Sequence, residues 1–144
     1  MRYLNKIVFI NSAAIRYSEV QLDGNIHLIG TQGVGKSTIL RAILFFYNAD
    51  TQRLGIPVEK KSYQDYYFPY ADSSIIYEVA REDGWFTVLS YKTMNRICYR
   101  FIASPYRPDL FIDEEGAPYP SDRIRSVLDK NGIKYSGAIS CLLY

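Results

Sequence analysis

The stretch GTQGVGKS, from Gly30 to Ser37, decides the fold because it is a complete G-x-x-x-x-G-K-[ST] phosphate-binding loop. Gly33 and Gly35 allow the backbone to wrap closely enough for successive N–H groups to point at phosphate oxygens. The ammonium group of Lys36 can reach the β- and γ-phosphates, and the hydroxyl of Ser37 can bind Mg²⁺. The sequence therefore predicts a site for a nucleotide and Mg²⁺.

The candidate nucleotide-binding residues are the loop itself and the residue that follows it. Gln32 and Val34 occupy variable positions of the motif, and Thr38 either assists Ser37 or caps the first helical turn. The full set is Gly30, Gln32, Gly33, Val34, Gly35, Lys36, Ser37 and Thr38. The alternative interpretation is an ordinary glycine turn between a strand and a helix, with a surface lysine.

Both flanks of the loop have the pattern that a phosphate-binding loop needs. Ile26–Ile29 is short and apolar with β-branched ends, which is typical of a strand. Ser37–Tyr47 contains neither Gly nor Pro and is apolar almost all round, which predicts a buried helix. A helix that begins at the loop directs the positive end of its dipole at the bound anion.

Three strands are predicted before the loop. Lys6–Asn11 is the first, Glu19–Leu22 is the second, and the hairpin signal Asp23–Gly24 leads into the third at Asn25–Ile29. A long Tyr-rich connection, Asn48–Ser73, follows the helix, and connections of this length are usually functional or mobile.

The second half of the chain predicts an antiparallel meander. Its strands are Ser74–Ala80, Trp85–Tyr91 and Arg96–Ile102, because each alternates polar and apolar residues and the connections are short. Leu110–Ile112 and Ala117–Tyr119 are expected to pair as a small hairpin.

A helix is predicted after this hairpin. Ser121 can cap its N-terminus, and Asn131–Gly132 can close its C-terminus. Ile124, Val127 and Leu128 form one apolar stripe, so this helix should pack on the sheet.

Composition limits the class of protein without naming a function. The 144 residues are enough for one domain with a real core, and the net charge of +2 argues neither for nor against nucleic acid. Cys98 and Cys141 lack paired spacing and predict buried, reduced thiols. With no stretch of transmembrane length and no signal peptide, we expect a cytoplasmic protein without a membrane partner.

Two stretches of the chain together resemble a known family. They are DGNIHLIGTQGVGKSTILRAI at residues 23–43 and LFIDEEGAPYPSDRIRSVLDKNGI at residues 110–133. Their order is similar to the N-terminal lobe of SMC-like, ABC-type ATPase heads, a superfamily that includes SMC proteins, MukB, RecN, SbcC and the Wadjet ATPase. The resemblance covers nearly the whole chain, and the phosphate-binding loop is its one specific motif.

The resemblance implies a fold and a division of the chain. The fold would be an α/β P-loop NTPase lobe, with a mixed sheet around the loop helix and an antiparallel β-subdomain. The single lobe, 1–144, would divide into the hairpin, strand, loop and helix (1–47), the Tyr-rich connection (48–73), the meander and hairpin (74–120), a helix (121–132), and a segment leading to a coiled coil outside this sequence (133–144).

The resemblance also implies cofactors and partners. The lobe would bind ATP and Mg²⁺, and hydrolysis would need a C-terminal lobe of the same full-length chain and a second head, with a homodimer expected. We therefore expect little or no hydrolysis by these 144 residues alone, self-association through the uncovered sheet, and DNA as a partner of the full protein. Arg53, Lys60 and Lys61, interleaved with tyrosines, could contact DNA or form a solvated loop.

Leu110–Glu114 imitates a Walker B run, with Asp113 for Mg²⁺ and Glu114 as the general base. The run has only three apolar residues, and Pro105, Pro108 and Pro118 surround it, which favours a hairpin turn over a central parallel strand. The catalytic residues therefore stay unknown, with Asp113 and Glu114 as a minor alternative.

Arg16 and Tyr17 lie in the hairpin before the loop. The resemblance implies that a basic residue here can approach the phosphates, so Arg16 is a candidate nucleotide contact. Tyr17 could stack on adenine or belong to an exposed turn.

Two further classes of function remain open. One is a small self-contained P-loop NTPase or nucleotide kinase. The other is an interaction module that is stabilised by a nucleotide without hydrolysing it.

Overall fold

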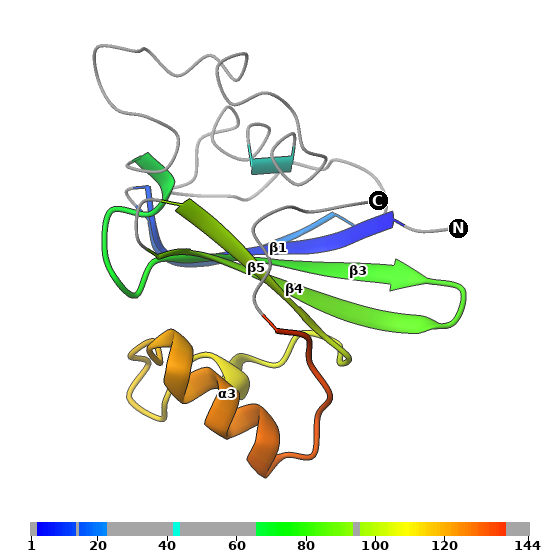
Figure 1. The fold of residues 1–144 in the computed structure, drawn as a ribbon. Coiled ribbons are helices and arrows are strands. Elements are labelled where there is room, and N and C mark those ends of the chain that lie inside the picture. The colour runs from blue at the N-terminus through cyan, green and yellow to red at the C-terminus, as the bar shows by residue number, and fades with distance from the viewer. Residues whose placement is uncertain (1–2, 14, 23–41, 44–65, 94–95, 138–144) are drawn as a thin grey trace.

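A computed structural model of the chain describes residues 3–13, 15–22, 42–43, 66–93 and 96–137. Within these ranges, five strands form one sheet in the order β2-β1-β3-β4-β5 (Figure 1). The strands are β1 (Tyr3–Ser12), β2 (Ile15–Gln21), β3 (Ser74–Arg81), β4 (Gly84–Thr93) and β5 (Arg96–Ile102). Every neighbouring pair is antiparallel.

Of the predicted strands, the first two and the three of the meander are found in the structure. The three strands of the meander become β3, β4 and β5, and Lys6–Asn11 lies inside β1. The second strand begins earlier than predicted, at Ile15, because its first residues pair with the end of β1 in the register Ser12 to Ile15. The strand predicted at Asn25–Ile29 lies outside the described residues, so the mixed sheet stays a prediction.

The first hairpin and the meander belong to the same sheet. β1 pairs with β3 from Tyr3 opposite Ala80 to Ile10 opposite Ser74. This pairing joins segments more than 60 residues apart and makes β1 and β3 interior strands. Their apolar side chains alternate between two faces, so each face of the sheet needs its own cover.

The two faces of the sheet carry separate apolar clusters. One cluster, here called the upper cluster, includes Ala42, Ile43, Tyr67 and Phe68, which pack on side chains of the sheet. The strands contribute Leu4, Ile7, Phe9, Ile15, Val20, Ile75, Tyr77, Val79, Val88, Ile97 and Tyr99 to it, and Leu22 directly after β2 belongs to it as well. In Figure 1 these covering segments lie above the sheet.

The other face carries the lower cluster, which is covered by a described α-helix together with Tyr106, Leu110 and Phe111. This helix is α3 (Ser121–Lys130), and its buried residues are Ile124 and Leu128, as the apolar stripe predicted. Val8, Ile10, Ile76, Leu89 and Ile102 of the sheet belong to the same cluster. In Figure 1 helix α3 lies below the sheet, opposite the upper cluster.

The ends of α3 confirm one prediction and correct another. Gly132 has φ +67, its N–H bonds the carbonyl of Asp129, and the N–H of Ile133 bonds the carbonyl of Leu128. This is a Schellman closure, as Asn131–Gly132 predicted. The prediction that Ser121 caps the N-terminus was wrong, because Pro120 is the N-cap and no side chain bonds there.

The hairpin predicted at Leu110–Ile112 and Ala117–Tyr119 forms in a shortened version, because Leu110 belongs to another element. This element is a short 3-10 helix, η2 (Pro108–Leu110), and the N–H of Phe111 bonds the carbonyl of Pro108. Proline favours such a turn because its ring fixes φ near the helical value. Ile112 and Pro118 form an antiparallel bridge, at which the N–H of Asp113 bonds the carbonyl of Ala117 and the N–H of Tyr119 bonds the carbonyl of Phe111.

Candidate functional site

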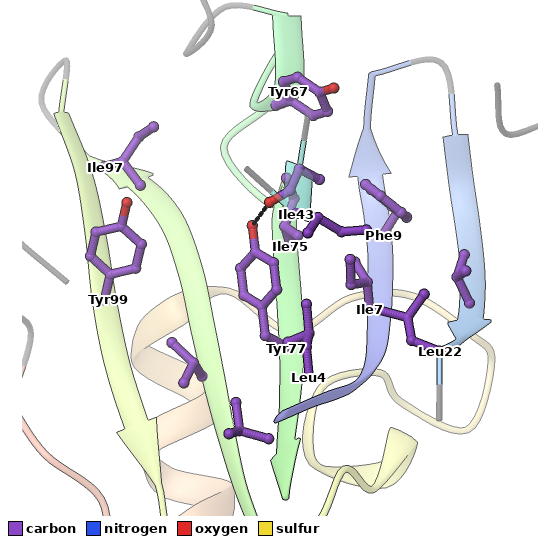
Figure 2. Packing of buried hydrophobic residues seen from close by; sticks show 14 of the residues in the cluster. Leu4, Ile7, Phe9, Leu22, Ile43, Tyr67, Ile75, Tyr77, Ile97 and Tyr99 are labelled. Carbon is purple, nitrogen blue, oxygen red and sulfur yellow. Dashed lines mark hydrogen bonds between the residues drawn. The ribbon is translucent and has the colours of Figure 1, made fainter. Parts of the chain in front are cut away.

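The helix that follows the phosphate-binding loop is described at Ala42 and Ile43. Both residues are helical and buried, and Ala42 is fully inaccessible to solvent. Figure 2 shows Ile43 lying over Ile75 and near Phe9. Both residues agree with the predicted buried helix Ser37–Tyr47, and the rest of that helix and the loop residues Gly30–Thr38 lie outside the described part of the chain.

A hydrogen bond fixes this helical segment to the middle of the sheet. The hydroxyl of Tyr77 donates to the main-chain carbonyl of Ala42 at 3.1 Å (Figure 2). Tyr77 lies on β3, which is buried along nearly its whole length. The segment next to the loop is therefore held by apolar packing and by a directed polar contact.

Arg16 lines a cavity of about 450 Å³ at the turn of the first hairpin. The cavity, here called the hairpin cavity, is lined by Asn11, Ala13, Ile15, Arg16, Tyr70 and Asp72. Arg16 is exposed and forms no ion pair or hydrogen bond with any other residue that the structure describes. Its guanidinium group is therefore available to an anionic ligand.

The hairpin cavity lies beside the upper cluster. Ile15 lines the cavity and belongs to the same cluster as Ala42 and Ile43. Tyr70 follows Tyr67 and Phe68, which are fully buried in that cluster. The cavity that Arg16 lines therefore shares Ile15 with the cluster that contains Ala42 and Ile43.

Tyr17 lies on the opposite face of the sheet from this helix. Its hydroxyl donates to Oε2 of Glu19 at 2.7 Å and shares a 2.8 Å hydrogen bond with the hydroxyl of Tyr106, a member of the lower cluster. Burial raises the pKa of Tyr17 to about 12, and Glu19 adds to the rise. The ring is held against the α3 face, which does not suit the stacking role considered from the sequence.

Asp113 and Glu114 also lie on the α3 face. They follow Phe111 and Ile112, which pack in the lower cluster. Asp113 Oδ1 accepts hydrogen bonds from the N–H groups of Glu115 and Ala117, both at 2.9 Å. The run is a turn that its own aspartate closes, and the Walker B interpretation needs a buried strand, which is not formed here.

The tyrosines at the end of the long connection have two different environments. Tyr67 is fully buried and Tyr66 packs against the upper cluster, whereas Tyr70 is 63% exposed. Arg53, Lys60 and Lys61 lie outside the described residues, so the basic and aromatic patch stays a prediction.

Sequence reasoning missed a second cavity, of about 660 Å³, on the outer side of α3. Its lining residues are Tyr119, Arg123, Ser126, Val127, Asp129 and Lys130. The signal in the sequence was the row of polar residues Arg123, Ser126 and Lys130, which lie at helical spacing beside Val127 of the apolar stripe. Asp129 is already engaged, because it accepts a hydrogen bond from Tyr135 at 2.9 Å.

Three further observations concern the described residues alone. No group of three or more His, Cys, Asp or Glu side chains is placed to hold a metal ion there. None of the helices found in those ranges is long and apolar enough to cross a membrane. Cys98 is buried and forms no disulfide within them, as predicted, and Cys141 lies outside them.

The described residues define a sheet with helical segments on both faces, in a chain that carries a phosphate-binding loop sequence. The model of one protein family, described as a protein of unknown function (DUF3584), matches residues 11–144. The chain belongs to this family. Neither the curated proteins nor the solved structures include a match to the chain.

Proposed function

We propose that this chain is the ATP-binding part of an SMC-like ATPase head. The observation that carries the proposal is the complete loop sequence of Gly30–Ser37, followed by the buried helical residues Ala42 and Ile43. The bond from Tyr77 to Ala42 supports it, because a phosphate site needs a helix that does not move when the anion binds.

The donors of the loop fit Mg-ATP in their chemistry. Backbone N–H groups and the ammonium group of Lys36 are hydrogen-bond donors and would bind phosphate oxygens, and the hydroxyl of Ser37 is an oxygen ligand of the kind that Mg²⁺ prefers. When bound, Mg²⁺ would neutralise charge on the β- and γ-phosphates. Arg16 is proposed as an additional contact, since its guanidinium group is exposed beside the hairpin cavity.

In the complete protein, two such heads would hold ATP between them, and hydrolysis would drive clamping on DNA or motion along it. This part of the proposal rests on the resemblance to SMC-like heads. The 144 residues contain no Ser-Gly-Gly signature, so the chain by itself is expected to bind ATP and to hydrolyse it slowly or not at all.

Thermal unfolding with and without Mg-ATP tests the proposal. A ligand that binds only the folded state raises the melting temperature, by several degrees at a concentration of about 100 Kd. Lys36→Ala should abolish this shift, and Lys130→Ala, which removes an exposed lysine on α3, should keep it. A shift that survives in Lys36→Ala would place the site elsewhere.

Turnover separates this proposal from the two other classes. Phosphate release at an ordinary enzymatic rate would favour a self-contained NTPase, and ADP formation that depends on an added acceptor nucleotide would favour a nucleotide kinase. ATP-dependent stabilisation without turnover supports either the ATPase half or a nucleotide-stabilised interaction module. A downstream coiled-coil region followed by a signature motif and a Walker B strand in the full-length gene would decide between those two.

A further inference from the structure

Three large aromatic side chains are exposed in the part of the chain that the structure describes. They are Tyr17, Tyr70 and Trp85, which are 38%, 63% and 43% exposed. Tyr17 is bound to Tyr106 on the α3 face. Trp85 pairs with Ala80 near the far end of β3, whereas Tyr70 lines the hairpin cavity at the other end, close to Ser74. Tyr70 is therefore the exposed aromatic ring that lies beside Arg16.

The backbone of Tyr70 is fixed although its ring is exposed. Its N–H donates to Oγ of Ser73 at 2.9 Å, and its carbonyl accepts from the N–H of Ser73 at 3.1 Å. The hydroxyl of Ser73 in turn donates to the main-chain carbonyl of Asn11. The turn that carries the ring is thus bonded internally and to the first hairpin.

A second contact joins the same two segments. Nδ2 of Asn11 donates to Oδ1 of Asp72 at 3.2 Å. Asn11 has φ +46, a left-handed conformation that Asn tolerates better than most residues. The hairpin and the 70–73 turn together give a wall whose backbone is held before any ligand arrives, and such preorganisation lowers the free-energy cost of binding.

The lining of the hairpin cavity combines four kinds of group. Tyr70 contributes an aromatic ring, Arg16 a cation, Asp72 a carboxylate and Ile15 an apolar surface. The volume of about 450 Å³ lies within the range of small-molecule sites. A flat heteroaromatic ligand that carries both hydrogen-bond donors and negative charge can interact with all four groups. A nucleotide is such a ligand.

We propose that the hairpin cavity holds the base of the bound nucleoside triphosphate, with the ring of Tyr70 stacked on that base. This inference rests on the proposed function, because it places the base of the same nucleotide whose phosphates Lys36 binds. It replaces Tyr17, the stacking candidate from the sequence, with a residue that follows the loop by more than 30 positions. Aromatic stacking tolerates different bases, so the site should accept ATP and GTP alike.

Equilibrium binding of ATP and of inorganic tripolyphosphate to the 144-residue chain tests the inference. Tyr70→Ala should raise the Kd for ATP about 10-fold and leave the Kd for tripolyphosphate unchanged, because tripolyphosphate has no base to stack. Tyr70→Phe should bind ATP within about two-fold of the original chain, since the ring remains. Trp85→Ala, which removes an exposed ring away from the cavity, should change neither Kd.

Lys36→Ala distinguishes the two proposals from each other. It should abolish binding of both ligands, whereas Tyr70→Ala should affect ATP alone. If Lys36→Ala abolishes ATP binding and Tyr70→Ala leaves the Kd for ATP unchanged, the base lies elsewhere and only this inference is overturned. If the original chain binds neither ligand, the proposed function fails, and the placement of the base fails with it.

Discussion

The phenolic hydroxyl of Tyr77 donates a hydrogen bond of 3.1 Å to the main-chain carbonyl oxygen of Ala42. Tyr77 lies on an interior strand, and Ala42 belongs to the helical segment that follows the phosphate-binding loop. The bond is buried and joins residues 35 positions apart. It links the central, almost wholly buried strand of the sheet to the element on which a phosphate site would depend.

Removing this hydroxyl should weaken the fold measurably. Tyr77→Phe keeps the ring and leaves a buried carbonyl without this donor, so the free energy of unfolding should fall by about 1 kcal/mol. Urea unfolding followed by circular dichroism measures the change. Tyr70→Phe is the matched control, because the Tyr70 ring is exposed and its hydroxyl forms no described bond. Equal losses in the two variants would contradict a structural role for the Tyr77 bond.

Glu78 is a carboxylate inside the α3 face of the sheet, only 6% exposed. Oε1 accepts from Nδ2 of Asn5 at 2.7 Å, and Oε2 accepts from the N–H of Tyr106 at 2.7 Å. Both partners are donors, so each oxygen of the carboxylate is needed as an acceptor. The side chain joins β3 to β1 and to the segment that precedes η2.

Glu78→Gln should therefore destabilise the protein despite its nearly identical shape. The amide can offer one oxygen, and its NH₂ group must face a donor, which leaves a buried polar pair unsatisfied. We expect a loss of about 2 kcal/mol in the free energy of unfolding, measured by urea denaturation. Glu114→Gln, on an exposed turn, is the control and should stay within about 0.5 kcal/mol of the original chain.

How far the sequence predicts the fold depends on how local the deciding contacts are. Strand alternation within Arg96–Ile102 places Ile97 and Tyr99 on one face, and both lie in the upper cluster. The pairing of β1 with β3 has no local signal, because it depends on two apolar strands meeting across a long stretch of chain. The sequence pattern therefore predicts which segments form strands better than it predicts which strands pair with each other.

The candidate site shows the same division. Arg16 could be nominated from its place before the loop, and it does line a cavity. Tyr70 could not be nominated from the sequence as a residue of the site. Its position depends on the hydrogen bonds that hold its turn against Asn11, and these are tertiary contacts. Tyr17 is adjacent to Arg16 in the sequence. Strand alternation nevertheless places its ring on the other face of the sheet, where it bonds Tyr106.

The hydrogen-bonded pair of Tyr17 and Tyr106 predicts a loss of stability at alkaline pH. Burial raises the pKa of Tyr17 to about 12, and burial followed by the bond to Tyr17 raises the pKa of Tyr106 further. In an unfolded chain both would ionise near pH 10. Above about pH 10 the folded state therefore binds more protons than the unfolded state, and the free energy of unfolding falls as pH rises.

Urea midpoints measured from about pH 9 upward test this pH dependence. The midpoint should stay constant below about pH 10 and fall between there and pH 12, where Tyr17 ionises in the folded protein. Tyr106→Phe removes one titrating group and the bond that joins the pair, so its midpoint should fall less steeply. Tyr70→Phe retains the pair and should follow the original chain. A midpoint independent of pH in this window would contradict the prediction.

Substitutions of Asp113 and Glu114 should have different effects if the two residues form a turn than if they form a Walker B site. In the turn, Asp113 Oδ1 accepts two backbone N–H groups at 2.9 Å, while Glu114 is exposed. Asp113→Ala should then lower the free energy of unfolding by about 1 kcal/mol, and Glu114→Ala should leave it unchanged.

Neither substitution should alter nucleotide binding, because both residues lie on the face of the sheet opposite Ala42 and Ile43. Isothermal titration with ATP at several Mg²⁺ concentrations, together with a phosphate-release assay, measures this directly. A Walker B pair behaves differently: losing the aspartate weakens Mg²⁺-dependent binding, and losing the glutamate stops turnover while ATP stays bound. Unchanged binding in both variants, with a loss of stability in Asp113→Ala alone, is the result that the geometry of the turn requires.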